Sequence, residues 1–132
     1  MNKSSQRTPP PAIILIENDS VTLELYQREL CKDFRIFAFT ELKGVLEVLA
    51  AQDIRAVVIE PEIDAKNGWD LIHTIHAAFP DRFIPVIVCS TRDNCNSSSS
   101  LEITKYLTKP VLPRTLREKT LEIIQKKDIS LK

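Results

Sequence analysis

The stretch that most constrains the fold is an apolar run, Ala56 to Ile59, that ends on the carboxylate of Glu60. Three of its four apolar residues are β-branched, which is typical of a strand buried on both faces. Such strands occur in parallel sheets that helices cover on either side. A carboxylate at the carboxyl end of the strand therefore lies at the edge where these sheets place their chemistry.

Length and composition indicate one globular domain. The chain has 132 residues, of which 43% are hydrophobic and 27% are charged. No apolar run approaches the roughly 18 residues of a membrane span, and none has the form of a secretory signal, so we expect a cytoplasmic protein with no membrane partner. The three cysteines, Cys31, Cys89 and Cys95, lack metal-type spacing and are expected to be reduced thiols.

Charge is unevenly distributed along a chain whose formal net charge is zero. Residues 17–81 include 13 acidic and 6 basic residues, whereas residues 101–132 include 8 basic and 4 acidic residues. Lysines spaced along an amphipathic helix are more often a solvated face than a nucleic acid site. We therefore expect no direct contact with nucleic acid.

Strand and helix patterns alternate along the chain. Apolar runs predict strands over 12–16, 35–39, 56–60, 83–90 and 105–108. Apolar residues at helical spacing predict helices over 20–32, from a Thr40 cap through Leu49, over 69–79 and over 113–126. The segment between residues 91 and 104 is rich in Ser and Asn and predicts a loop or a single turn, so the fourth helix of the series is expected to be short or missing.

This alternation predicts a doubly wound α/β fold with a five-stranded parallel sheet. The predicted domain spans residues 12–127, with a flexible tail over 1–11 and a C-terminal tail over 128–132. The carboxyl ends of parallel strands lie at one edge, so Glu17, Asn18 and Glu60 are expected to converge there. Ser90 and Lys109 end the fourth and fifth strands and bring a hydroxyl and an ammonium group to the same edge.

The order of these residues resembles the receiver domain of two-component response regulators. That pattern has an acidic pair after the first strand, a phosphoryl-accepting aspartate after the third, Thr or Ser after the fourth and Lys-Pro after the fifth. The matching positions here are Glu17-Asn18, Glu60, Ser90 and Lys109-Pro110. The resemblance covers most of the chain and implies a flavodoxin-like sheet of the receiver type, with Tyr106 as the candidate aromatic switch.

Two departures from the receiver pattern affect the chemistry. Asn18 replaces a metal-binding aspartate, so the acidic set of Glu17, Asn18, Glu60 and Glu62 is expected to bind Mg²⁺ weakly or not at all. Glu60 replaces the acceptor aspartate, and a misplaced nucleophile loses about a hundredfold in rate for a shift of about 1 Å. We expect a degenerate phosphotransfer site, no enzymatic activity and no cofactor.

The expected function is an atypical, phosphorylation-independent signalling domain in a two-component or phosphorelay context. Glu60 would either mimic a phosphorylated acceptor in part or form a structural ion pair with Lys109 in an inert scaffold. The expected partner is a histidine kinase or a downstream effector that docks near Lys105, Tyr106 and the last helix. The sequence does not decide between a monomer and a homodimer. The alternatives are a functional phosphoacceptor with Mg²⁺-dependent phosphotransfer and a pseudo-receiver that binds a small molecule.

Overall fold

The computed structural model describes the backbone of residues 9–91 and 103–130, and the side chains of these residues apart from 63–66 and 127–130. The elements in chain order are β1 (Ala12–Ile16), α1 (Ser20–Leu30), β2 (Arg35–Phe39), α2 (Val45–Ala51), β3 (Ile54–Ile59), the 3₁₀ helix η2 (Pro61–Asp64), α3 (Ala65–Ala78), β4 (Val86–Ser90), β5 (Lys105–Thr108) and α4 (Pro113–Ser130). No helix in this described part is long and apolar enough to cross a membrane.

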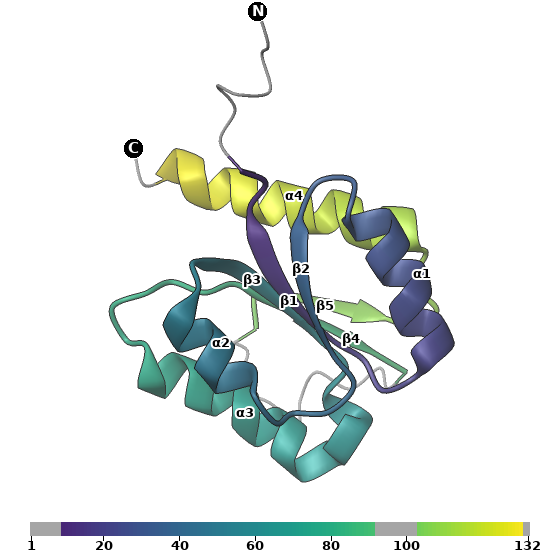
Figure 1. Ribbon diagram of the computed structural model, residues 1–132, viewed down its shortest axis with the longest axis horizontal. Helices are drawn as coiled ribbons and strands as arrows, with labels where there is room; N and C mark the ends of the chain where they lie inside the picture. The colour runs from purple at the N-terminus through teal and green to yellow at the C-terminus, as the bar shows by residue number, and fades with distance from the viewer. Residues whose placement is uncertain (1–8, 92–102, 131–132) are drawn as a thin grey trace, which may run out of the picture.

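The strands form one parallel sheet in the order β2-β1-β3-β4-β5. Helices α1 and α4 cover one face, and α2 and α3 cover the other (Figure 1). This arrangement confirms the predicted doubly wound α/β fold. The register pairs Ile16 with Ile59, so the residues that follow them, Glu17 and Glu60, leave the sheet side by side.

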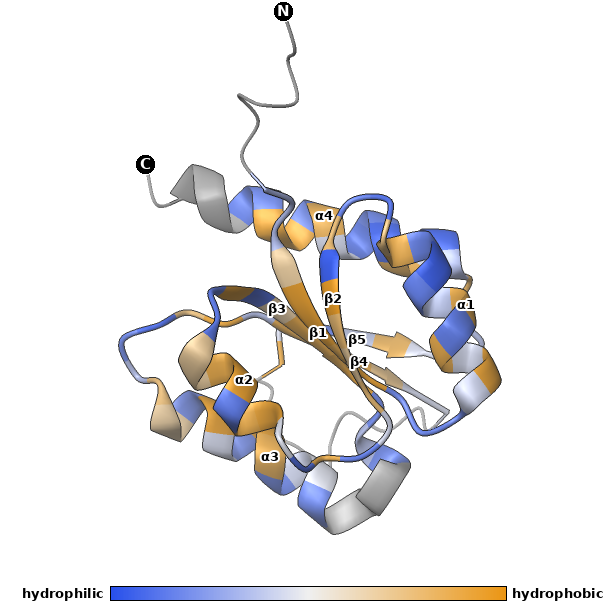
Figure 2. Cartoon of the chain, viewed as in Figure 1, coloured by the Kyte–Doolittle hydropathy of each residue, from blue (hydrophilic) through white to orange (hydrophobic). Residues whose placement is uncertain are grey.

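The core has two layers, one on each face of the sheet. Alternate residues of β1 point to opposite faces: Ile14 and Ile16 pack with α2 and α3, whereas Ile13 and Leu15 pack with α1 and α4. The apolar centre of the sheet and the mixed polarity of the helices are visible in Figure 2. Burial on both faces explains why β1 and β3 are continuous apolar runs in the sequence.

The strand predictions hold closely, with revisions at β3, which ends at Ile59 and not at Glu60, and at β4. The bounds of β1, β2 and β5 are those expected, and β3 begins two residues early, at Ile54. β4 begins at Val86, not at Phe83, and the side chain of Phe83 is 58% exposed. Pro85 has no N–H to donate to a neighbouring strand, although its carbonyl accepts a hydrogen bond from Val57 N (2.9 Å).

The predicted start of the second helix, at a Thr40 cap, is wrong. Residues 40–44 form bends and turns, and α2 begins at Val45. Gly44 immediately precedes the helix with a φ angle of 91°, in the left-handed region that glycine adopts without strain. The glycine that we placed inside the helix therefore sets its boundary.

Other helix boundaries also differ from expectation, and α1 ends at Leu30 instead of residue 32. α3 begins at Ala65 instead of Trp69, because η2 leads directly into it and turns the expected loop into helix. α4 continues to Ser130, so residues 128–130, which were assigned to the C-terminal tail, are helical. The expectation of a short or missing fourth helix concerns residues 92–102, which lie outside the described residues.

Candidate functional site

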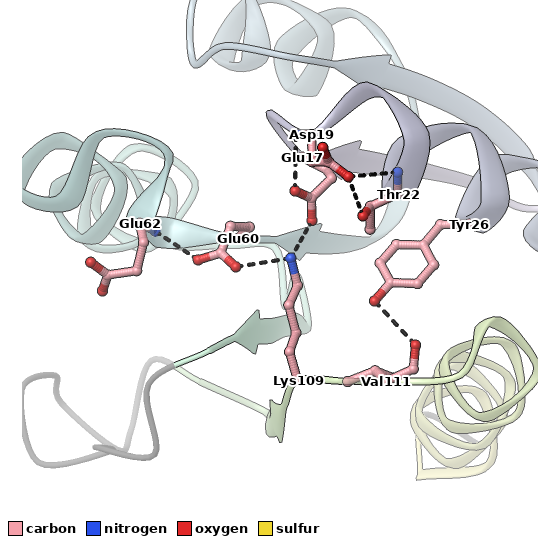
Figure 3. Close-up of polar contacts among 8 residues, drawn as sticks. All are labelled: Glu17, Asp19, Thr22, Tyr26, Glu60, Glu62, Lys109 and Val111. Carbon is pink, nitrogen blue, oxygen red and sulfur yellow. Dashed lines mark hydrogen bonds and ion pairs between the residues drawn. The ribbon is translucent and has the colours of Figure 1, made fainter.

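Three charged side chains from three strand ends meet at the carboxyl edge of the sheet (Figure 3). Lys109 Nζ lies 2.7 Å from Glu17 Oε1 and 3.0 Å from Glu60 Oε1. Glu17 and Glu60 are only 2% and 6% exposed. We call these three residues the Lys109 cluster. The convergence predicted from the strand order is therefore present for these three side chains.

Backbone hydrogen bonds beyond the strand ends fix each member of the Lys109 cluster. Glu17 N donates to Phe39 O (3.0 Å), and Glu60 N donates to Ile16 O (3.0 Å). Lys109 N donates to Ser90 O at 2.7 Å. Because the sheet ladder continues through all three residues, their Cα positions are set by the fold and not by mobile loops.

All four carboxylate oxygens of the Lys109 cluster accept a hydrogen bond. Lys109 Nζ donates to Oε1 of both Glu17 and Glu60. Glu17 Oε2 accepts from Asp19 N (3.1 Å), and Glu60 Oε2 accepts from Glu62 N (3.0 Å). Each glutamate side chain thus also holds the first turn of the segment that follows its own strand.

The electrostatics of the Lys109 cluster keep the lysine protonated. Burial by itself lowers the pKa of Lys109, but the hydrogen bonds from its ammonium group to Glu17 and Glu60 raise the pKa above its ordinary value. One ammonium group faces two carboxylates, so the cluster carries one net negative charge when both glutamates are ionised. That charge lies at a buried site, where water screens it poorly.

The residues after Glu17 begin α1. Asp19 is the N-cap of this helix, and its side chain accepts hydrogen bonds from both the backbone N–H and the hydroxyl of Thr22. These hydrogen bonds lower the pKa of Asp19. Asn18 is exposed. Asp19 therefore acts as a helix cap, and Asn18 adds an amide, not a charge, to the edge.

The donor set of this edge offers a magnesium ion two carboxylates that share one ammonium group, and a neutral amide at Asn18. Mg²⁺ requires several oxygen ligands in near-octahedral order, and carboxylates supply the charge that draws it from water. Here Glu17 and Glu60 already accept hydrogen bonds at every oxygen, and the ammonium group of Lys109 bridges them. No group of three or more metal-ligating His, Cys, Asp or Glu side chains is arranged for a metal within the described residues.

The other predicted site residues lie on neighbouring strands. Ser90 is fully buried at the end of β4, where its carbonyl accepts from the backbone of Lys109. Tyr106 lies on β5, is half-buried and packs against the core layer that contains α2 and α3. Glu62 follows Glu60 on η2, and its Oε2 accepts from Trp69 Nε1 at 3.4 Å. Trp69 is thus a fluorescent reporter connected to the site.

No pattern in the sequence indicated the contact between Tyr26 and the loop before α4. The Tyr26 hydroxyl donates to Val111 O at 3.3 Å (Figure 3). Burial raises the pKa of Tyr26 to about 12. A cavity of about 410 Å³ lies beside Tyr26 and Lys109, and its other lining residues are Thr22, Leu25, Thr91, Pro110, Val111 and Pro113. Helical spacing indicated only that Tyr26 faces inward.

Comparisons with known proteins agree with this architecture. A family model, the response regulator receiver domain, matches residues 13–121. A search of curated proteins found no match. A response regulator from Thermotoga maritima is similar in structure, with 20% identity, a TM-score of 0.73 and coverage of 88% of this chain and 98% of that chain.

Two further solved structures are similar. A CheY-like receiver domain protein from Methanospirillum hungatei has 16% identity and a TM-score of 0.78, and the alignment covers 92% of this chain and 98% of that one. TrrA from Thermotoga maritima, solved in complex with Mg²⁺-BeF, has 18% identity and a TM-score of 0.73, with 86% and 98% covered. These identities support the fold alone. The family model spans most of the chain, and the protein belongs to the response regulator receiver domain family.

Proposed function

We propose that this receiver domain accepts no phosphoryl group and signals by binding another protein. The observation that carries the proposal is the state of the Glu60 carboxylate. Its Oε1 is bound to Lys109, and its Oε2 is bound to the backbone N–H of Glu62. A carboxylate nucleophile must present an oxygen lone pair in line with phosphorus, and these two contacts fix the direction in which Glu60, one methylene longer than aspartate, presents its oxygens.

The second support is the missing charge for a metal ion. Phosphoryl transfer depends on cations that neutralise the reacting oxygens. One similar receiver, TrrA, was solved in complex with Mg²⁺-BeF. This chain presents exposed Asn18 beside a glutamate pair that already shares Lys109. We propose that it forms no such complex.

Glu60 also suggests how the domain holds a signalling state without phosphate. Its carboxylate brings one negative charge within 3.0 Å of Lys109. A phosphorylated side chain would bring about 1.5 to 2 negative charges. We therefore propose a permanent, partial mimic of the phosphorylated state in a cytoplasmic two-component pathway, read by a histidine kinase or a downstream effector.

The phosphorylation test uses Trp69 as its probe. Mg²⁺ is titrated while Trp69 fluorescence is recorded, acetyl phosphate is then added, and the intact mass is measured. We expect no saturable fluorescence change and no added phosphoryl mass. The double variant Asn18→Asp/Glu60→Asp restores the receiver pattern and serves as the matched positive control. An adduct on the unmodified chain would establish a functional phosphoacceptor instead.

Mimicry is tested by removing only the charge of Glu60. Glu60→Gln keeps an acceptor for the N–H of Glu62 but removes the charge opposite Lys109. If Glu60 maintains the signalling state, this variant binds the native partner more weakly than the parent chain does. Equal affinity would leave the inert scaffold as the correct description.

A second candidate function follows from the cavity beside Tyr26. Its volume of about 410 Å³ falls in the range of small-molecule sites, about 300 to 1,000 Å³. A pseudo-receiver that binds a small molecule there would retain it through gentle purification. Native mass spectrometry of the freshly purified chain would detect the additional mass.

A further inference from the structure

A second cavity lies at the opposite end of β5 from the Lys109 cluster. It has a volume of about 400 Å³ and is lined by Phe83, Thr104, Lys105, Lys119, Glu122, Ile123 and Lys126. We call it the Phe83 pocket. Lys105 begins β5 and Lys109 follows its end, so the pocket and the Lys109 cluster are separated by the length of that strand.

Phe83 is held in an exposed position by its neighbours. Its side chain is 58% exposed, whereas the next residue, Ile84, is 1% exposed. On its other side, Arg82 Nη1 donates to Leu49 O at 2.7 Å, and the guanidinium group lies over the ring of Phe79. An aromatic ring on an anchored segment loses little conformational entropy when it binds.

The wall of the Phe83 pocket formed by Thr104 is also fixed. Thr104 N donates to Val86 O at 2.8 Å, and its hydroxyl accepts from Val86 N at 3.1 Å. The opposite wall is one face of α4, since Lys119, Glu122, Ile123 and Lys126 are spaced by three, four and seven residues. Two hydrogen bonds to Val86 therefore hold the Thr104 side of the pocket in place.

The charges around the Phe83 pocket are mainly positive. Among the described residues that line the pocket, three are lysines (Lys105, Lys119 and Lys126) and one is an acid (Glu122). That acid lies 3.7 Å from Lys119, in a pair whose side chains are both partly exposed. The apolar part of the lining comes from Phe83 and Ile123. The pocket therefore suits a ligand with one apolar group surrounded by negative charge.

We infer that the Phe83 pocket binds an acidic segment of a partner protein, with one large apolar side chain of that segment packed against Phe83. This inference deepens the proposed function, on which it rests, by stating the chemistry of the partner. A volume of about 400 Å³ accommodates single side chains. A nucleic acid strand would use a basic groove with several stacking aromatic rings, and the described lining of this pocket has one aromatic residue, Phe83.

The test uses a fluorescently labelled peptide of acidic residues around one central phenylalanine, titrated with the full chain and followed by anisotropy. We expect saturable binding, and about tenfold weaker binding by Phe83→Ala because an anchoring aromatic contact is lost. Lys105→Glu should weaken binding about fivefold, since it reverses a rim charge. Lys43→Glu is the matched charge reversal at an exposed lysine outside the pocket and should bind like the parent.

Three results would overturn the inference. These are equal binding of a peptide whose phenylalanine is replaced by alanine, equal binding by Phe83→Ala, or equally effective competition by a single-stranded oligonucleotide of the same charge. Circular dichroism on Phe83→Ala checks that the variant is folded. The intact-mass experiment with acetyl phosphate is independent of the peptide, so a failed inference and a failed proposed function give different results.

Discussion

Two ion clusters in this molecule share one arrangement, a cation between two carboxylates, and differ in burial. In the Lys109 cluster, the contacts are 2.7 and 3.0 Å, and the side chains of Lys109, Glu17 and Glu60 are 15%, 3% and 7% exposed. In the second cluster, Arg117 contacts Glu29 and Asp33 at 2.8 Å each, and these three side chains are 23%, 17% and 32% exposed. A further cation, Lys32, also contacts Glu29 at 2.9 Å.

The difference shows what each cluster can do. The Arg117 cluster connects α4 to α1 and the turn after it, and water screens its charges. The Lys109 cluster joins the ends of β1, β3 and β5 in a site with little water. Removing one member of the cluster leaves a buried ion without its partner. The loss of stability is then large, even though the intact cluster adds little net stability. Matching geometry therefore does not imply matching energetics.

The largest expected effect is that of Lys109→Met. Removing the ammonium group leaves Glu17 and Glu60 buried and facing each other, which should lower the free energy of unfolding by about 3–5 kcal/mol at neutral pH. Without Lys109, two buried like charges face each other, and protonation of either carboxylate removes the repulsion. The deficit should therefore shrink as pH falls. Urea denaturation at neutral and acidic pH measures both quantities.

Arg117→Met is the matched control, because it makes the same kind of change in the exposed cluster. Its effect should be clearly smaller than that of Lys109→Met. If the two substitutions destabilise the chain equally, burial does not distinguish the clusters and the comparison fails.

Gly68→Ala should have the next largest effect. A Cβ atom at residue 68 would lie 2.1 Å from Pro61 O, a backbone atom, so α3 or η2 must shift. We expect a loss of about 1–3 kcal/mol, as for other overpacked sites. Pro61 follows Glu60, so the shift should also disturb the Lys109 cluster and leave the Arg117 cluster intact. Thermal unfolding with Trp69 fluorescence measures the change, and an unchanged melting temperature would contradict it.

Alkaline pH tests how well water is excluded beside Lys109. Burial raises the pKa of Tyr26 from 10.0 to about 12. The unfolded chain loses this proton first, so the folded state loses roughly 2 kcal/mol of stability as pH rises from 10 to about 12. Lys109, whose pKa is also raised, acts in the same direction. Denaturation across this window measures the loss, and Tyr26→Phe should remove the tyrosine share. If Tyr26 ionised near pH 10, water would have access to its hydroxyl group, and the site would not be desolvated.

The smallest expected effect is the salt dependence of Arg117→Met. At about 1 M salt the Debye length is roughly 3 Å, so exposed pairs contribute little. The stability difference between Arg117→Met and the parent chain should decrease towards zero as salt is raised, whereas that of Lys109→Met should persist. Denaturation in low and high salt checks this. A salt-independent Arg117→Met effect would indicate that its side chain acts through packing.

The sequence allowed the sheet to be predicted closely and the helix starts poorly. Strands buried on both faces appear as apolar runs, so the bounds of β1 followed directly. The starts of α2 and α3 depend on the left-handed Gly44 and on the close approach of Gly68 to Pro61. Both are properties of local backbone geometry that apolar spacing does not report.

The site was predicted in outline. Strand order implied that Glu17, Glu60 and Lys109 would meet, but not that one ammonium group would serve both glutamates. The hydrogen bond from Tyr26 to Val111 joins residues 85 positions apart, and no local pattern indicates it. Phe83 was placed inside a strand, because an aromatic residue beside apolar neighbours has the pattern of a buried one.

The Lys109 cluster has more carboxylates than cations, and the described lining of the Phe83 pocket has more lysines than acids, so the two ends of β5 carry local charge of opposite sign. The net charge is zero, so a charged partner exerts almost no overall pull on the domain. It does exert a torque, within about 8 Å at physiological ionic strength. An approaching acidic protein would rotate the domain until its lysine end faces the contact. This charge layout therefore favours a correct orientation at encounter more than a faster encounter.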